Sequence, residues 1–529
     1  DRIDYNRKEL SIWRKDMSIL SVSNLTHGFG DRAIFEDVSF RLLKGEHIGL
    51  IGANGEGKST FMNIVTGKQL PDEGKVEWAK YVTTGYLDQH SVLKPGQTIR
   101  DVLRMAFDDL FAIEARISEA YEEMATADDQ TMADLLEEVG ELQERLEVHD
   151  FYTLDAKIEE VARALGITAF GLETDVTSLS GGQRTKVLLA KLLLEKPDIL
   201  LLDEPTNYLD AEHIEWLKRY LQNYENAFIL ISHDIPFLNS VINIIYHVEN
   251  LKLSRYVGDY ENFQAVHAMK RAQLEAAYER QQKEIADLKD FVNRNKARVA
   301  TRNMAMSRQK KLDKMEVIEL QGEKPKPKFD FQSARTPGRF IFEANQLEIG
   351  YSQPLTKPLD LVFERNQKVA IIGANGIGKT TLLKSLMGLI PALAGQVEQG
   401  DYLEIGYFEQ EVASGNRQTP LEAVWNAFPA MNQAEVRAAL ARCGLTSKHI
   451  ESQIQVLSGG EQAKVRLCLL MNAPHNVLIL DEPTNHLDVD AKEELARALK
   501  EYKGSILMVC HEPEFYQGWV DQIWDFNQF

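Results

Sequence analysis

Two stretches of the chain, IGLIGANGEGKST (residues 48–60) and VAIIGANGIGKTT (residues 369–381), are nearly the same sequence. Each begins with an apolar run, which predicts a buried strand, and continues into a stretch with helical spacing. Between them stands the pattern Gly-x4-Gly-Lys-Ser/Thr. Glycines in such a turn let backbone N–H groups wrap phosphates, and the helix that follows adds positive potential. Each stretch therefore predicts a phosphate-binding loop (P-loop).

Two further motifs are repeated in the same order. SLSGGQ (178–183) matches VLSGGE (456–461), and ILLLDEPTNYLD (199–210) matches VLILDEPTNHLD (477–488). Ser180 lies 24 residues before Glu204, and Ser458 lies 24 residues before Glu482. Two ladders of motifs with equal spacing predict a tandem duplication of one α/β nucleotide-binding domain.

The composition sets limits on the class of protein. A chain of 529 residues is too long for one core, which favours two large domains. No apolar run approaches the roughly 18–20 residues that span a bilayer, so we expect no membrane contact and a cytoplasmic location. Three scattered cysteines, Cys443, Cys468 and Cys510, are expected to be small buried residues in a reducing compartment.

The motif spacing also predicts domain limits. Residues 1–16 precede Met17 and are expected to be a tag or a non-native extension. We expect a first ATPase domain at 17–261, a helical interdomain linker at 262–335 and a second ATPase domain at 336–529. The first domain carries 43 extra residues before its SLSGGQ motif, and apolar residues recur there at helical spacing. This predicts a helical arm at about 97–160; an ordinary helical loop, slightly enlarged, is the alternative.

The predicted linker has its own pattern. Apolar residues recur at helical spacing from Leu274 to Val292, and Lys-Pro-Lys-Pro-Lys ends the segment at 324–328. We expect two long helices, with the basic block FVNRNKARVATRNMAMSRQKKLDK (291–314) near their turn.

The repeated motifs predict the chemistry of two sites. The P-loop lysines would reach the β- and γ-phosphates, and the next hydroxyl would bind Mg²⁺ together with the aspartate that ends the apolar strand. The following glutamate would orient an attacking water, and a histidine 29 residues later could touch the γ-phosphate. The residues are Lys58, Ser59, Asp203, Glu204 and His233 in the first half, and Lys379, Thr380, Asp481, Glu482 and His511 in the second.

These motifs resemble those of ATP-binding-cassette (ABC) ATPases over both halves of the chain. The resemblance implies that two ATP molecules are each sandwiched between the P-loop of one domain and the LSGGQ-type signature of the other. It also implies glutamines that contact Mg²⁺ and water (Gln89, Gln410), and aromatic residues that stack on adenine (Phe29, Tyr351). The other residues implied in ATP binding are Gly52, Asn54, Gly55, Gly57, Thr60, Gly373, Asn375, Gly376, Gly378 and Thr381 in the P-loops, and Ser180, Gly181, Gly182, Gln183, Ser458, Gly459, Gly460 and Glu461 in the signatures.

The two halves are not identical. Glu56 stands inside the first P-loop, Glu461 replaces the signature glutamine, and Cys510-His511-Glu512 replaces Ser232-His233-Asp234. We therefore expect the two sites to hydrolyse ATP at different rates.

The whole architecture resembles the ABC-F family, in particular its bacterial translation factors. The resemblance implies an α/β fold of two tandem ABC-type P-loop ATPase domains, with a helical arm inserted in the first and an α-helical hairpin linker between them. It further implies that the ATP-bound closed form enters the E site of the 70S ribosome and that the linker approaches P-site tRNA. A ribosome-protecting antibiotic-resistance protein is the alternative; an ATPase subunit of a transporter and a DNA-associated cassette ATPase are more distant ones.

Charge is divided unequally along the chain. The net charge is -20, yet residues 291–314 hold eight basic residues and one acid. This block predicts contact with rRNA or tRNA phosphates, although a solvated helix face is the alternative. The predicted arm is strongly acidic, which favours contact with a basic ribosomal protein. The candidate RNA-binding residues are Arg294, Lys296, Arg298, Arg302, Arg308, Lys310, Lys311 and Lys314. We expect the protein to act as a monomer.

Overall fold

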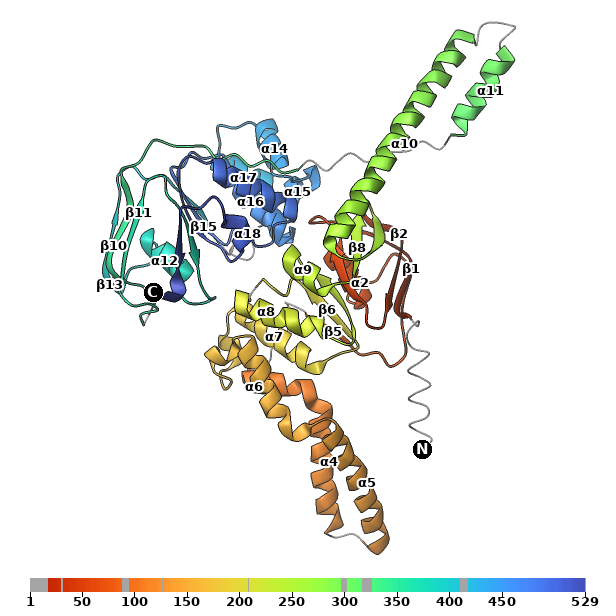
Figure 1. Cartoon of the computed structure of the whole chain (residues 1–529), viewed down its shortest axis with the longest axis vertical. Helices are drawn as coiled ribbons and strands as arrows, with labels where there is room; N and C mark the ends of the chain where they lie inside the picture. The colour runs from red at the N-terminus through yellow and green to blue at the C-terminus, as the bar shows by residue number, and fades with distance from the viewer. Residues whose placement is uncertain are drawn as a thin grey trace.

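The computed structural model describes residues 18–29, 32–87, 95–125, 128–207, 209–295, 302–315, 326–351, 353–409 and 417–528. Two α/β domains lie side by side, and two helical hairpins project from opposite ends of the molecule (Figure 1). Residues 1–16, predicted to be non-native, lie outside the described residues.

The first domain is built on a six-stranded sheet of strand order β5-β6-β7-β3-β8-β9, in which only β8 and β9 pair antiparallel. Its strands are β3 (His47–Ile51), β5 (Thr84–Tyr86), β6 (Ile199–Asp203), β7 (Ala227–Ile231), β8 (Ile244–Glu249) and β9 (Lys252–Val257). A three-stranded antiparallel sheet, β2-β1-β4, accompanies it, with β1 (Ser18–Phe29), β2 (Arg32–Leu43) and β4 (Glu73–Trp78).

Alternate residues of each central strand face different layers. On β6, Ile199 and Leu201 pack in a core shared with β1, β2 and the helix after the P-loop, whereas Leu200 and Leu202 pack against the helical layer. This is the two-residue period of a strand buried on both faces. The helices of this domain are α2 (Lys58–Val65), α3 (Ile99–Arg104), α6 (Leu154–Ala164), α7 (Gly181–Glu195), α8 (Ala211–Gln222) and α9 (Ile235–Val241).

The second domain repeats the plan. A parallel sheet of order β14-β15-β16-β12-β17 consists of β12 (Lys368–Ile372), β14 (Ile405–Phe408), β15 (Val477–Asp481), β16 (Ser505–Val509) and β17 (Gln522–Asp525). Its antiparallel sheet contains β10 (Phe340–Glu348), β11 (Leu359–Glu364) and β13 (Ala394–Gln399). Its helices are α12 (Lys379–Leu386), α13 (Pro420–Ala427), α14 (Gln433–Arg442), α15 (Ser447–Glu451), α16 (Gly459–Met471), α17 (Val489–Glu501) and α18 (Pro513–Tyr516). The expected duplication of an α/β domain is confirmed.

The helical arm is confirmed as an antiparallel pair, α4 (Asp108–Met124) and α5 (Asp129–Val148). The two helices share a small core of their own that includes Ile117, Ala120, Leu135, Val139 and Leu146. Arg116 on α4 reaches two carboxylates, Glu138 across the pair at 2.8 Å and Glu123 further along its own helix at 2.9 Å. The arm is therefore a packed element and not an enlarged loop.

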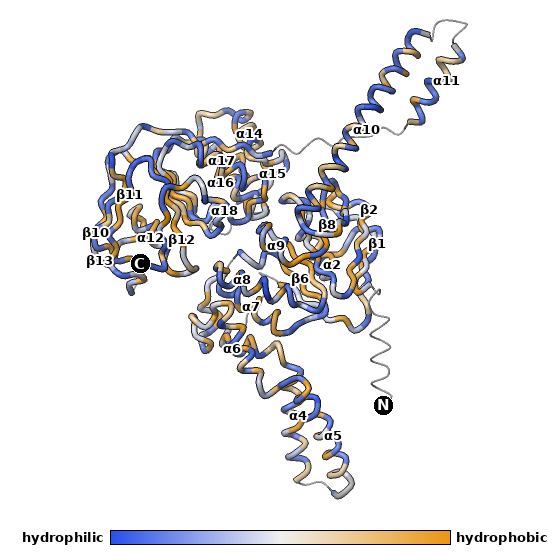
Figure 2. Tube along the Cα trace, viewed as in Figure 1, coloured by the Kyte–Doolittle hydropathy of each residue, from blue (hydrophilic) through white to orange (hydrophobic). Residues whose placement is uncertain are grey.

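The linker begins with α10 (Tyr260–Asn295), which is 36 residues long, and returns through α11 (Arg302–Asp313), which is 12 residues long. A hairpin is confirmed, but the expectation of two long helices is wrong, because the second ends at Asp313. Among the described side chains of α11 only Ala305 is buried, so little apolar surface is available to stabilise a longer packed helix. Figure 2 shows the same contrast, since apolar residues concentrate in the sheets while the hairpin is largely hydrophilic.

All three cysteines are buried and unpaired, as expected. Among the helices of the described residues, none combines the length and the apolar character that crossing a membrane requires.

Candidate active site

Each P-loop lies between a parallel strand and a short helix at the carboxyl edge of its sheet. The first connects β3 to α2, and the second connects β12 to α12. Gly57 has φ of 104°, and a Cβ atom there would lie 2.4 Å from Ile34 Cγ2. Gly378 has the matching φ of 108°. These positions need glycine because the backbone is left-handed there and, at Gly57, no space remains for a side chain.

The P-loop lysines lie inside their own loops. Lys58 Nζ donates to the carbonyl oxygens of Gly52 (2.7 Å) and Ala53 (3.2 Å), and Lys379 Nζ donates to those of Gly373 and Ala374. Both lysines are buried, and burial lowers the pKa of each ammonium group. A phosphate anion would stabilise the charged form of both, which fits the loop to this ligand.

The predicted Mg²⁺ ligands meet in both domains. Ser59 Oγ donates to Asp203 Oδ2 (3.0 Å), and Thr380 Oγ1 donates to Asp481 Oδ2 (2.7 Å). Asp481 is fully buried, its Oδ1 atom has no hydrogen-bond partner among the described residues, and burial raises its pKa to about 6. A hydroxyl beside a buried, incompletely bonded carboxylate fits a hard divalent cation such as Mg²⁺. Gln89 and Gln410, also predicted as Mg²⁺ ligands, lie outside the described residues.

The predicted catalytic glutamates follow directly, at the ends of β6 and β15. Both have positive φ, 49° for Glu204 and 50° for Glu482, a conformation that costs a non-glycine residue about 1–3 kcal/mol. His233 Nε2 lies 3.5 Å from Glu204 Oε1, and His511 Nε2 lies 3.3 Å from Glu482 Oε1. The structure therefore brings each glutamate together with the histidine that the spacing pairs it with.

The two glutamates differ in their surroundings. Burial, followed by the nearby charge of Asp203, raises the pKa of Glu204 to about 8. Burial also opposes the charge of Glu482, but a hydrogen bond and positive charge from His511 outweigh it and lower the pKa. Asn485 Nδ2 donates to Glu482 Oε2 (2.5 Å), whereas the equivalent Asn207 Nδ2 is buried and has no hydrogen-bond partner within the described part of the chain.

The signature serines begin helices. Ser180 is the N-cap of α7, where it forms a capping box with Gln183, and Ser458 does the same with Glu461 at the start of α16. Glu461, which replaces the signature glutamine, uses its other oxygen to bind His449 Nε2 at 3.1 Å. Glutamate is thus accommodated because both oxygens have partners. The capping pattern Ser-x-x-Gln/Glu was a readable signal for these helix starts.

Contacts between the domains occur at both P-loops. Asn54 of the first P-loop donates through Nδ2 to the carbonyl of His486 (2.9 Å) and accepts through Oδ1 from His233 Nε2 (3.1 Å). A Cβ at Gly460, in the second signature, would lie 2.1 Å from Asn54 Nδ2. In the second P-loop, the Asn375 amide donates to Asp210 Oδ1 of the first domain (2.6 Å). Each P-loop therefore touches the opposite domain, as a sandwich site requires.

A cavity of about 480 Å³ separates the catalytic residues of the two halves. Its walls include Glu204 and His233 from the first domain and Glu482, His486 and His511 from the second. The catalytic groups of both sites therefore share one interdomain space.

Sequence reasoning missed several residues of this interface, among them Asp210, Asp488, Asn485 and His486. All four belong to the repeated DEPTNYLD and DEPTNHLD stretches, so the repetition of this stretch in both halves was the available signal. The aromatic residues predicted to stack on adenine are accessible, with Phe29 49% and Tyr351 71% exposed. Their role stays a prediction.

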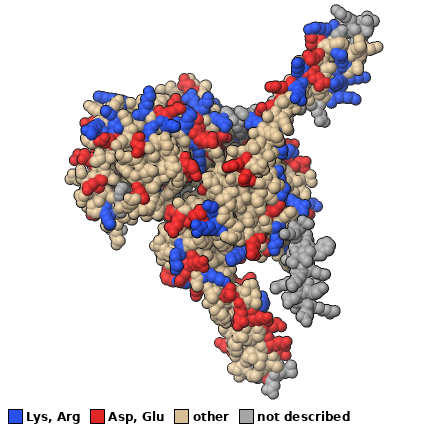
Figure 3. All heavy atoms as spheres, in the orientation of Figure 1, with Lys and Arg blue, Asp and Glu red and all other residues tan. Residues whose placement is uncertain are grey.

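The candidate RNA-binding residues lie around the outer end of the linker hairpin (Figure 3). Arg294 lies at the end of α10 and pairs with Asp290, while Arg308 stacks over Phe291 with its Cζ 3.6 Å from the ring centre. Lys310, Lys311 and Lys314 follow on or just after α11, and Lys311 pairs with Glu284. Lys296 and Arg298, together with the side chain of Arg302, lie outside the described residues.

The fold and the two interdomain sites define a tandem ABC ATPase, which binds and hydrolyses ATP. A family model described as ABC transporter matches residues 35–207 and 356–485, and another with the same description matches residues 246–331.

The chain belongs to the ABC-F family. It is 35% identical to the ABC transporter F family member 2 of Arabidopsis thaliana, over 95% of this chain and 74% of that protein. It is 68% identical to the uncharacterized ABC transporter ATP-binding protein YfmM of Bacillus subtilis, over 96% and 98% of the two chains. It is also 34% identical to the energy-dependent translational throttle protein EttA of Mycobacterium tuberculosis, over 94% and 89%. The archaeal ribosome recycling factor aABCE1, in complex with a ribosomal stalk protein, shares the fold, with a TM-score of 0.56 at 18% identity, over 94% of this chain and 86% of that one.

Proposed function

We propose that this chain is a ribosome-associated ATPase whose ATP-bound closed form binds the E site of the 70S ribosome. The carrying observation is that each P-loop contacts the opposite domain, through Asn54 and His486 at one site and Asn375 and Asp210 at the other. Nucleotide at these sites can therefore set the angle between the domains, and with it the directions of arm and linker. The name of the relative EttA supports a role in translation.

The residues divide the hydrolysis step between them. Glu204 and Glu482 orient the attacking water, while His233 and His511 hold the glutamates and face the γ-phosphate of the substrate. Ser59 with Asp203, and Thr380 with Asp481, would hold Mg²⁺, which when bound neutralises charge on the β- and γ-phosphates. Cleavage of the γ-phosphate removes the group that bridges the domains, and the protein is released.

The charge distribution supports a division of partners. The basic tip of the linker is suited to rRNA and to P-site tRNA, since phosphate binding releases counterions without reading sequence. The arm carries mainly Asp and Glu in Figure 3, which suits a basic ribosomal protein better than RNA. A monomer is sufficient, because both composite sites form within one chain.

The decisive test is a double variant, Glu204→Gln with Glu482→Gln. General-base removal slows hydrolysis by about 10²–10⁴-fold and leaves ATP binding intact. With ATP, this variant is expected to co-sediment with 70S ribosomes and not with plasmid DNA. The matched control, Lys58→Met with Lys379→Met, cannot hold the phosphates and is expected to stay in the supernatant. Failure of the trapped variant to bind ribosomes would reject the proposal and favour a DNA or membrane partner.

A second experiment tests the linker. Neutralising Arg294, Arg298, Arg302 and Arg308 should weaken ATP-dependent ribosome binding and reduce its salt dependence, by roughly 0.7–0.9 in the log–log slope for each phosphate that is no longer neutralised. The control neutralises four exposed lysines elsewhere, Lys44, Lys75, Lys80 and Lys503. Equal binding by wild type and the linker variant would remove RNA binding from the function of the tip.

A further inference from the structure

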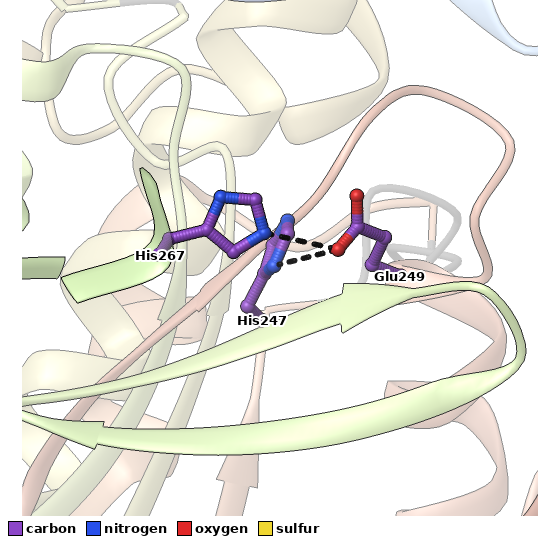
Figure 4. Close-up of side chains that lie close together, drawn as sticks. All are labelled: His247, Glu249 and His267. Carbon is purple, nitrogen blue, oxygen red and sulfur yellow. Dashed lines mark hydrogen bonds and ion pairs between the residues drawn. The ribbon is translucent and has the colours of Figure 1, made fainter. Parts of the chain in front are cut away.

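Three potential metal ligands meet where the linker leaves the first ATPase domain (Figure 4). His247 and Glu249 lie at the end of β8, and His267 lies near the start of α10. One ring nitrogen from each histidine and one oxygen of the carboxylate all lie within 4.8 Å of one another. Two secondary-structure elements that differ in sequence position thus direct their ligands toward one point.

The distances suit a small cation. Glu249 Oε2 lies 3.0 Å from His267 Nε2 and 3.8 Å from His247 Nδ1. Ligand atoms about 2.0–2.2 Å from a zinc ion lie roughly 3.0–3.5 Å from one another. A movement of a few tenths of an ångström at the half-exposed Glu249 side chain would therefore bring all three atoms to bonding distance.

The histidines are held in place before any ion binds. Phe263 is buried between them, with its ring centre 5.0 Å from that of His247 and 5.4 Å from that of His267. The two imidazole planes stand at 88° to each other. Fixed rings lower the conformational entropy that ion binding would cost.

An ion pair alone explains only half of the cluster. His267 can pair with Glu249 as an imidazolium, but burial lowers the pKa of His247 to about 4, so this ring is neutral at neutral pH. A neutral imidazole supplies no charge to Glu249 and does offer a nitrogen lone pair. Two imidazoles and one carboxylate form a donor set typical of zinc and its neighbours in the first transition row.

The second domain offers an internal comparison. Asp525 pairs with Ile372 in the sheet as His247 pairs with Ile51, so Asp525 and Asn527 stand where His247 and Glu249 stand in the first domain. Asn527 Oδ1 accepts from the Ala374 amide of the P-loop. The histidines therefore belong to the half from which the linker emerges.

We propose that His247, Glu249 and His267 bind one divalent transition-metal ion, Zn²⁺ in the first instance, which fastens the base of α10 to β8. The position gives the ion a mechanical role. β8 lies against the first P-loop, since a Cβ at Gly52 would be 2.6 Å from the carbonyl of Val248. A metal bond between β8 and α10 would therefore hold the linker at a fixed angle to the first ATP site.

The test uses the full chain without a polyhistidine tag, stripped of metal and kept in saturating Mg²⁺ and ADP so that the nucleotide sites are occupied. Zn²⁺ is titrated in competition with a chromophoric chelator. Wild type is expected to bind one equivalent, and Glu249→Gln and His267→Ala are each expected to weaken binding by about tenfold or more. His149→Ala, a change at an exposed histidine near the arm, should bind as wild type does.

Glu249→Gln keeps the size of a half-exposed side chain, so it tests the ligand without a large effect on folding. Co²⁺ provides a second readout, because its visible spectrum reports coordination by nitrogen and oxygen and should disappear in both ligand variants. Zn²⁺ affinity equal to wild type in both ligand variants would overturn the proposal, and so would failure of wild type to take up one equivalent.

Discussion

Two equivalent aspartates end the repeated DEPTNYLD and DEPTNHLD stretches of the two halves, and the fold uses them differently. Asp488 caps α17 by accepting from the Ala491 amide (3.0 Å) and binds Lys464 Nζ at 2.9 Å. Asp210 makes no capping bond to α8 and stands 4.0 Å from Lys186, but it accepts from the Asn375 amide across the interface. One residue of the pair stabilises its own domain, while the other reaches the opposite P-loop.

The helices that begin at these aspartates extend the contrast. Lys492 on α17 binds both oxygens of Glu512 at 2.8 Å, whereas Ile214 holds the equivalent position on α8. Asp234, the counterpart of Glu512, instead caps α9 by accepting from the Phe237 amide. The second half therefore satisfies its charges internally, and the first half directs one of its charges to its neighbour. A duplicated sequence has thus produced two sites with different interfaces.

The largest expected effect is on stability. Asp488→Ala removes a helix cap and leaves Lys464, which is 6% exposed, buried without its carboxylate. Removing one partner of a buried pair costs about 3–5 kcal/mol. Asp210→Ala should cost less than about 1 kcal/mol, because Asp210 has no capping bond and only a distant lysine. Urea titration followed by near-ultraviolet circular dichroism measures both, and equal destabilisation would contradict the asymmetry.

A smaller effect is expected on hydrolysis. Asn485→Ala, made in the Glu204→Gln background so that only the second site turns over, removes a hydrogen bond to the catalytic carboxylate. Hydrogen bonds to charged groups contribute about 1.5–3 kcal/mol, so kcat should fall by about tenfold or more.

Asn207→Ala, in the Glu482→Gln background, is the matched control. Its amide has no hydrogen-bond partner among the residues that the structure describes, and kcat at the first site should change little. Steady-state phosphate release measures both pairs. If the two substitutions slow their sites equally, the glutamates are positioned in the same way when ATP is bound, and the asymmetry between the halves does not persist in turnover.

Particular residues show what the sequence can and cannot predict. Lys58, Ser59 and Glu204 were predictable because their chemistry depends on short motifs that are written twice. The acidic arm was predictable because an insertion with helical spacing must pack on itself.

Other contacts depend on chain segments far apart in sequence. Asp210 and Asp488 stand in the same motif, and only the packing of the domains decides which of them reaches a P-loop. The cluster of His247 and His267 requires the exit angle of α10 from the sheet, which no local pattern encodes. The early end of α11 likewise reflects the small apolar surface that the helix can bury and not helix propensity.

The smallest expected effect concerns the P-loop asparagines. The Asn54 side chain joins the first P-loop to His233 and to the carbonyl of His486, whereas Asn375 contacts Asp210 through its backbone amide. Asn54→Ala removes two hydrogen bonds, each contributing about 0.5–1.5 kcal/mol, so ATP-driven closure should require roughly fivefold more ATP. Asn375→Ala keeps the backbone donor and should close as wild type does. Energy transfer between dyes on the two domains measures closure against ATP concentration. A shift with Asn375→Ala as large as that with Asn54→Ala would mean that the ATP-bound interface is symmetric, and the difference between the halves would then belong to the nucleotide-free protein alone.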